Sequence, residues 1–145
     1  MPIPFSPLQA QDSLIRLSGM AMKILVIDPS PHFLQAMCNF INALPRCECI
    51  AATSLDEAFE QPSMQEVNLA LINYSLRNAD AKSAAHRIRL EAPTAMVLLL
   101  TEDGADYYDS CLAAEAHGCL VTDSLGSDLP PLVAGLAHEL ERECT

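Results

Sequence analysis

The clearest hydrophobic pattern in the chain is the run Val-Asn-Leu-Ala-Leu-Ile-Asn at residues 67–73. A nearly continuous apolar run without alternation is typical of a parallel strand that is buried on both faces. The run ends on the polar amide of Asn73. Because residues just past the carboxyl ends of central strands line the functional crevice of open α/β sheets, Asn73 marks the expected position of a site.

Four more strands are predicted at residues 23–28, 47–53, 95–101 and 119–122, each a short apolar run. Helical periodicity separates them, with helices expected from Pro31 to before Pro45, at residues 54–61, 79–91 and 105–116, and from about residue 129 onward. Ser30 is a capping residue for the first of these helices, and Ser54 with Glu57 forms a capping box for the second. The pattern is therefore five strands alternating with five helices.

This alternation predicts an α/β fold with one parallel sheet covered by helices on both faces, because each right-handed crossover returns over the sheet. The flavodoxin-like strand order 2-1-3-4-5 is expected, with its switch point between the first and third strands. Four polar residues would then meet at the carboxyl edge, with Glu102 and Asp103 beside them: Asp28, Asn73, Thr101 and Thr122.

The chain has 145 residues, half of them hydrophobic, which suffices for one domain with its own core. Residues 1–21 differ in composition from the rest of the chain, with three early prolines and a weak helical stretch. We interpret residues 1–21 as an N-terminal tail or upstream extension and residues 22–145 as the domain. The tail could cap the domain or swap onto a neighbouring copy.

Charge and composition exclude several functions. A net charge of −11 with eight Lys and Arg argues against direct nucleic-acid binding, which needs a basic surface. The apolar runs are far shorter than the ~20 residues that span a bilayer, and the N-terminus lacks a signal-peptide pattern, so a cytoplasmic protein that does not enter membranes is expected. The six cysteines fit neither a disulfide framework nor zinc knuckles and are expected to be reduced core thiols, with Cys47 and Cys49 on one strand face.

Residues 22–141 resemble the receiver domains of bacterial two-component response regulators, the CheY-like group. The resemblance rests on KILVIDPSP, NLALINYSL, MVLLLTEDG and AHGCLVTDSL, with 45 residues from Asp28 to Asn73 and 28 from Asn73 to Thr101. It implies a response regulator that works in phosphorelay signal transduction. Because fold alone does not establish activity, the site residues decide what remains of that function.

In that family, two acids after the first strand and an aspartate ending the third hold Mg²⁺, and the third acid accepts the phosphoryl group. A Thr or Ser ending the fourth strand and a Lys ending the fifth bind the phosphate. The corresponding residues here are Asp28, Pro29, Asn73, Thr101 and Thr122. Compared with the family pattern, the chain therefore retains the first acid and the hydroxyl, and it lacks the second acid, the acceptor aspartate and the lysine.

These departures predict a degenerate pseudo-receiver. An amide cannot serve as the carboxylate nucleophile, and Asp28 alone is a weak metal candidate for an ion that prefers several oxygen ligands. No Mg²⁺ or other cofactor is therefore expected, although Glu102 or Asp103 could in principle restore a ligand. Asp28 and Asn73 are instead expected to hydrogen-bond each other.

Enzyme classes are excluded by their motifs, because neither a phosphate-binding glycine loop nor a catalytic triad can be assigned to the strand ends. We predict a stand-alone signalling protein that acts by binding a protein such as a histidine kinase, a regulator or an output protein. It could also form a homodimer through the fourth helix, fifth strand and fifth helix of the family, here residues 105–141. Tyr107, Tyr108 and Leu125 are the candidate contacts. The alternative is a receiver switched by a ligand, a redox event or phosphorylation of Ser75.

Overall fold

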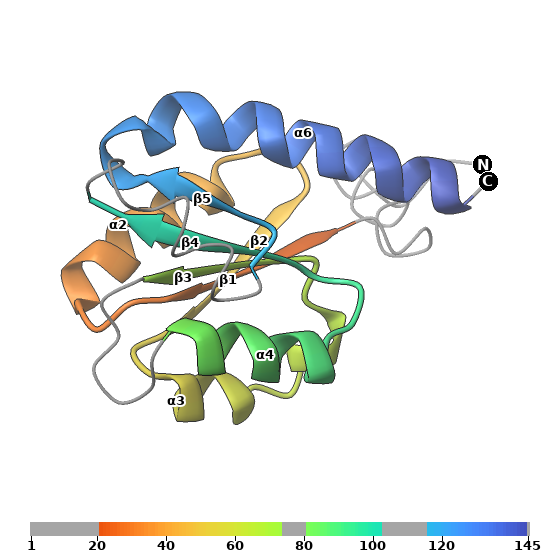
Figure 1. Cartoon of the computed structure of the whole chain (residues 1–145). Helices are drawn as coiled ribbons and strands as arrows, with labels where there is room; N and C mark the ends of the chain where they lie inside the picture. Colours follow the sequence, from red (N-terminus) through yellow and green to blue (C-terminus); the bar gives the residue numbers. More distant parts are fainter. Residues whose placement is uncertain (1–20, 74–80, 103–115, 145) are drawn as a thin grey trace, which may run out of the picture.

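The computed structural model describes residues 21–73, 81–102 and 116–144 (Figure 1). Within these ranges, five parallel strands form one sheet in the order β2-β1-β3-β4-β5. The strands are β1 (Met22–Ile27), β2 (Cys47–Ala52), β3 (Leu69–Asn73), β4 (Met96–Thr101) and β5 (Gly118–Val121). The predicted fold class and strand order are confirmed, and strand bounds differ from the expected ones by one or two residues.

Helices cover both faces of this sheet (Figure 1). They are α2 (Pro31–Asn42), α3 (Leu55–Phe59), α4 (Ala81–Glu91) and α6 (Leu125–Cys144), with 3-10 turns η1 (Met64–Glu66) and η2 (Thr122–Ser124). Buried side chains of α3 and α4 belong to one core cluster, and those of α2 and α6 belong to another on the opposite face. The helix expected at residues 105–116 lies almost entirely outside the described residues.

The central strands serve both clusters, because successive side chains of a strand point to opposite faces. In β1, Leu25 and Ile27 pack into the cluster under α3 and α4, whereas Ile24 and Val26 pack into the cluster under α2 and α6. Residues 69–72 of β3 are completely buried. This two-sided burial explains why the strands read as continuous apolar runs rather than alternating ones.

The predicted capping residues start their helices as expected. Ser30 Oγ accepts a hydrogen bond from the backbone N–H of Phe33 at 3.3 Å, and Ser54 Oγ accepts one from Glu57 at 3.1 Å. The carboxylate of Glu57 accepts from the backbone N–H and the hydroxyl of Thr53. Glu57 therefore holds the end of β2 as well as the first turn of α3.

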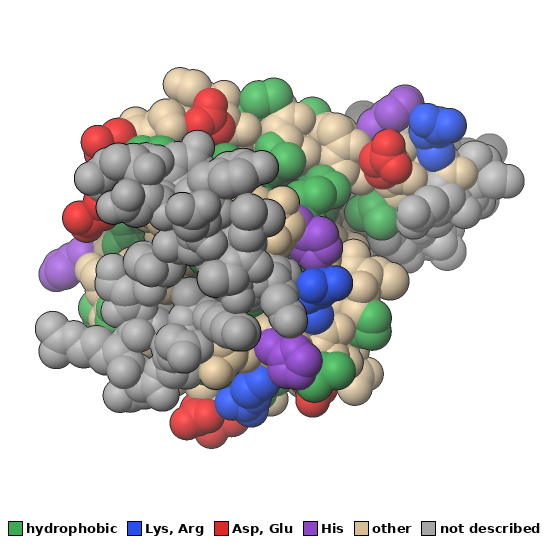
Figure 2. All heavy atoms as spheres, viewed as in Figure 1, with side chains coloured by type: hydrophobic (Ala, Val, Ile, Leu, Met, Phe, Trp, Pro, Cys, Tyr) green, Lys and Arg blue, Asp and Glu red, His purple; other side chains and the backbone are tan. Residues whose placement is uncertain are grey.

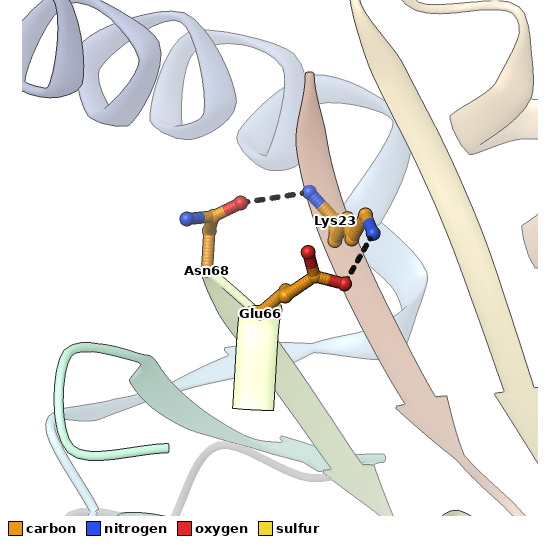
Figure 3. A network of polar contacts seen from close by, with 3 residues as sticks. All are labelled: Lys23, Glu66 and Asn68. Atoms are coloured by element: carbon orange, nitrogen blue, oxygen red, sulfur yellow. Dashed lines mark hydrogen bonds and ion pairs between the residues drawn. The ribbon is translucent and has the colours of Figure 1, made fainter. Parts of the chain in front are cut away.

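The amino ends of β1 and β3 are joined by a polar cluster (Figure 3). The side-chain oxygen of Asn68 accepts a hydrogen bond from the backbone N–H of Lys23 at 2.9 Å, and the Lys23 ammonium pairs with Glu66 at 2.9 Å. The backbone N–H of Asn68 also donates to the Lys23 carbonyl at 2.9 Å. Asn68 thus links the amino ends of β1 and β3, at the edge of the sheet opposite to Asn73.

The predicted exposure of Leu125 is wrong. Leu125 is the first residue of α6, only 6% exposed, and lies with Leu129 and Val133 in the core cluster under α2 and α6. The three residues are four apart, so they form one stripe along the helix. The segment Ser-Leu-Gly-Ser at residues 124–127 suggested a loop here, but Ser124 donates to the Asp128 carboxylate at 2.8 Å and holds the first turn in place.

The prediction that all six cysteines are reduced is also wrong, because Cys119 is disulfide-bonded. Cys38, Cys47 and Cys49 carry free thiols, and Cys47 and Cys49 pack toward the same core cluster, as the strand alternation predicted.

None of the helices in the described ranges combines the length and apolar character that crossing a membrane requires.

Candidate functional site at the carboxyl edge of the sheet

Asp28 and Asn73 lie side by side at the carboxyl edge of the sheet. Ile27 and Ile72 are paired in the register of β1 and β3, so the next residue of each chain segment emerges at the same level. The side-chain nitrogen Nδ2 of Asn73 donates a hydrogen bond to Oδ2 of Asp28 at 2.6 Å. The predicted contact between the two residues is confirmed.

The Asp28 carboxylate is buried, with only 4% of the residue exposed, and both of its oxygens are hydrogen-bonded. Oδ1 accepts from the backbone N–H of Ser30 at 2.8 Å, while Oδ2 accepts from Asn73. Charge-assisted hydrogen bonds of this kind are what makes a buried carboxylate tolerable. Ser30 is the N-cap residue of α2, so the site and the start of that helix share one hydrogen-bonded loop. This role of Ser30 toward Asp28 was not predicted, because backbone donors carry no sequence signal of their own.

Thr101 ends β4 at the same edge, one position beyond Leu100, which pairs with Asn73. It is 7% exposed, and among the described residues its Oγ1 is a buried side-chain oxygen that has no hydrogen-bond partner. A buried hydroxyl without a partner costs about 1–3 kcal/mol. Thr122 is half-buried and follows Val121, the partner of Thr101 on β5. The sheet therefore places all four predicted site residues at one edge.

The donor set at this edge does not fit Mg²⁺. This ion requires near-octahedral oxygen coordination and is usually anchored by one or two carboxylates. Asp28 supplies one carboxylate, but both of its oxygens already accept hydrogen bonds, Pro29 has no ligand atom in its side chain, and Asn73 points an N–H donor at Asp28. Within the described ranges, no group of three or more His, Cys, Asp or Glu residues could hold a metal ion. Glu102 is exposed, and Asp103 lies outside the described residues.

A histidine near this sheet has a structural contact rather than a position suited to catalysis. The Nδ1 atom of His117 accepts a hydrogen bond from the backbone N–H of Val97 at 2.9 Å, and the backbone N–H of His117 donates to the Val97 carbonyl at 2.8 Å. His117 thus extends the contact between β4 and β5 by one residue before Gly118. Three further residues named from the sequence lie outside the described residues: Ser75, Tyr107 and Tyr108.

Neither a protein-family model nor a curated protein sequence matches the chain. Solved structures do match in fold. One is the signal receiver domain of an HD domain-containing protein from Pseudomonas fluorescens, with a TM-score of 0.70, 20% identity, and coverage of 86% of this chain and 92% of that chain. Another is a CheY-like response regulator receiver domain protein from Methanospirillum hungatei, with a TM-score of 0.69, 18% identity, and coverage of 84% and 98%.

A third similar structure is the complex of the P1 domain of CheA3 with CheY6 from R. sphaeroides, matched with a TM-score of 0.67, 17% identity, and coverage of 81% of this chain and 98% of that chain. At such identities the likeness establishes the fold. The structural neighbours are receiver domains of two-component signalling, and one of them was solved with a partner protein domain.

Proposed function

We propose that the chain is a receiver-like signalling module that acts by binding other proteins and is not phosphorylated on aspartate. The observation that carries the proposal is the Asn73 amide, which stands at the end of β3 and donates to Asp28 at 2.6 Å. An aspartyl phosphate forms when an ionised carboxylate attacks phosphorus, whereas a neutral amide lacks that charge and cannot give a stable acyl-phosphate product.

Two further substitutions support the same proposal. Pro29 supplies no second acid beside Asp28, and Thr122 provides a neutral hydroxyl in place of the ammonium that would pair with a phosphoryl oxygen. The acceptor, the metal ligand and the phosphate partner are thus all changed within one edge of the sheet. What is retained is the fold itself, and one of the structures with a similar fold is a complex of CheY6 with the P1 domain of CheA3.

The proposed function is therefore carried by a surface that binds other proteins. The expected location of the protein is the cytoplasm. By resemblance, residues 105–141 form the contact face for a histidine kinase, a regulator, an output protein or a second copy of the chain. In Figure 2, hydrophobic side chains lie over α6 at the upper edge, interspersed with acidic ones. Tyr107 and Tyr108 remain proposed contacts, whereas the buried Leu125 is withdrawn as one.

The phosphorylation part is tested with acetyl phosphate and Mg²⁺, followed by intact mass. We expect no added phosphoryl group on the wild type or on Asn73→Asp, because the other two positions remain changed. The combined Asn73→Asp, Pro29→Asp and Thr122→Lys variant is the matched restoration. A base-labile phosphoryl adduct on the wild-type chain would overturn the proposal.

The binding part is tested by sedimentation velocity and by capture of partners from native lysate. Tyr107→Ala and Tyr108→Ala should weaken self-association or capture without changing the circular-dichroism spectrum. The control is Leu90→Ala, because Leu90 is 69% exposed on α4, on the opposite face from α6. If Leu90→Ala alone weakens binding, the contact face is the one formed by α3 and α4.

A further inference from the structure

Two cysteines face each other between α2 and β2, the strand at the edge of the sheet. Cys38 lies on α2 and Cys49 lies on β2, and their sulfur atoms are 2.7 Å apart. Both residues are half-buried, and neither is in a disulfide. The pair lies apart from the polar residues at the carboxyl edge.

The separation of the two sulfurs falls between a bond and a non-bonded contact. A disulfide bond measures about 2.05 Å, whereas non-bonded carbon atoms prefer about 3.5–4.0 Å and sulfur is larger than carbon. At 2.7 Å the two thiols are closer than separate side chains prefer. Cys38 and Cys49 therefore have converging side chains, which a disulfide between two residues requires.

A second contact fixes the helix against the strand at the same place. The side-chain oxygen of Asn42, one turn after Cys38 on α2, accepts a hydrogen bond from the backbone N–H of Cys49 at 2.9 Å. The spacing between α2 and β2 is thus set independently of the sulfur contact. Closing a bond between the sulfurs shortens their 2.7 Å separation to about 2.05 Å.

The third nearby thiol is directed elsewhere. Cys47 lies two residues before Cys49 on the same face of β2, and its sulfur donates to the Pro45 carbonyl at 3.4 Å. No cluster of three or more potential metal ligands occurs in the described ranges, so Cys38 and Cys49 do not belong to such a cluster there. The geometry singles out one pair.

From this geometry we infer that Cys38 and Cys49 are a redox-active dithiol that a peroxide oxidises to an intramolecular disulfide joining α2 to β2. The Cys38 thiolate attacks hydrogen peroxide, forming a sulfenic acid and releasing water after proton uptake. The Cys49 sulfur then attacks the sulfenic sulfur, a second water leaves, and the thiol proton of Cys49 is lost with it. Two thiols and one peroxide give one disulfide and two waters, with two electrons passing from the sulfurs to the peroxide oxygens.

The assignment of roles follows from the surroundings of Cys49. Burial raises the pKa of the Cys49 thiol, and the hydrogen bond to Cys38 and the charge of Cys38 raise it further. Cys49 is therefore poorly suited to the first attack on peroxide and takes the resolving step, in which proximity offsets its raised pKa and its thiol proton leaves with the water. Half-burial slows the first step, because peroxide reacts with accessible thiolates. In a reducing compartment the disulfide would be transient and reversible.

The expected consequence is a tighter connection between helix and sheet edge. A disulfide restricts the unfolded chain between Cys38 and Cys49, so the oxidised protein should unfold at a temperature several degrees higher. This chemistry does not depend on which protein the domain binds or on whether it is phosphorylated.

The test is peptide mapping of the full chain, first fully reduced, then treated with stoichiometric hydrogen peroxide and alkylated. Trypsin cleaves after Arg46 and a glutamyl protease after Glu48, so Cys38, Cys47 and Cys49 fall on three separate peptides. We expect the Cys38 and Cys49 peptides to appear joined, with the mass of two hydrogens lost and dithiothreitol restoring both thiols.

The control is Cys47→Ser, which should retain both the linkage and the rise in melting temperature. Cys38→Ala and Cys49→Ala should lose the linkage and show a smaller rise in melting temperature than Cys47→Ser, because only the disulfide of Cys119 can re-form in them. The mapping of the wild-type chain does not rely on those variants folding. Alkylation of Cys38 and Cys49 after peroxide treatment, or a linkage that uses Cys47 instead, would refute the inference.

Discussion

Replacing Asn73 with Asp tests the candidate site most directly. The substitution removes the N–H that donates to Asp28 at 2.6 Å and places a second carboxylate in its position. The lost charge-assisted hydrogen bond is worth about 1.5–3 kcal/mol. Repulsion between two unit charges about 4 Å apart is about 4 kcal/mol at an effective dielectric constant near 20. The pair can escape part of this repulsion by retaining one proton.

Solvent reduces the repulsion, because Asn73 is half-buried although Asp28 is almost fully buried. We therefore expect Asn73→Asp to lower the free energy of unfolding by about 2–4 kcal/mol at pH 7, which corresponds to a fall in melting temperature of about 8–16 °C for a domain of this size. The introduced carboxyl has a raised pKa in the folded state, so its penalty is absent well below pH 4 and develops as pH rises toward neutral.

The matched control is Asn68→Asp, which adds the same charge at the opposite edge (Figure 3). Asn68 uses its side-chain oxygen to accept from the Lys23 N–H, and a carboxylate can accept that bond equally well. Differential scanning calorimetry at pH 4 and pH 7 with both variants provides the comparison. An equal loss for the two variants, or a loss for Asn73→Asp that does not grow with pH, would refute the reasoning. A large stabilisation of the wild type by millimolar Mg²⁺ would refute the conclusion that the site does not fit the ion.

Other predictions follow from single contacts. Thr101→Val should raise the free energy of unfolding by about 1 kcal/mol in urea titrations, since it removes a buried hydroxyl without a partner, whereas Thr53→Val should lower it because Thr53 donates to Glu57. Leu125→Ala should cost about 2–5 kcal/mol, and the exposed Leu90→Ala should change stability by less than about 0.5 kcal/mol; similar losses would contradict the assigned burial. Burial raises the pKa of the Cys47 thiol, and burial together with the contact to Cys38 raises the pKa of the Cys49 thiol. The free energy of unfolding of the reduced protein should therefore be unaffected by these thiols below their ordinary pKa of 9.0 and should fall as pH rises above that value. Urea titrations across this range should show a slope that Cys49→Ala flattens; an unchanged slope would show that other groups cause it.

The sheet could be predicted from the sequence because burial on two faces leaves a strong signal. Runs such as residues 69–72 contain only apolar residues, so their pattern differs from that of a surface helix, which has a polar face. The residues that follow such runs mark the edge of the sheet where the site lies. The contact between Asp28 and Asn73 followed from strand order and residue type alone. Its hydrogen-bond direction is also fixed by chemistry, because an ionised carboxylate can only accept.

Features that depend on three-dimensional context were not predictable in the same way. The start of α6 was placed too late because the segment Ser-Leu-Gly-Ser at residues 124–127 is typical of a loop, whereas the hydrogen bond from Ser124 to Asp128 and the burial of Leu125 favour the helix. The proximity of Cys38 to Cys49 was also missed, since one lies on a helix and the other on a strand and no fixed spacing links them. Periodicity locates elements but does not reveal which side chains meet between them.

The amide at position 73 changes how this fold can respond to a signal. A pocket with adjacent carboxylates needs a cation, so its state depends on what is bound, and that dependence can be coupled to a shape change. Here the hydrogen bond from Asn73 satisfies Asp28 within the protein, and Ser30 joins the same carboxylate to the N-terminus of α2. Under the proposed function, a signal would act on another contact of α2 or of the sheet edge. The sulfur pair is such a contact, because Cys38 lies on the helix that Ser30 caps and Cys49 lies on the strand that Asn42 holds against it.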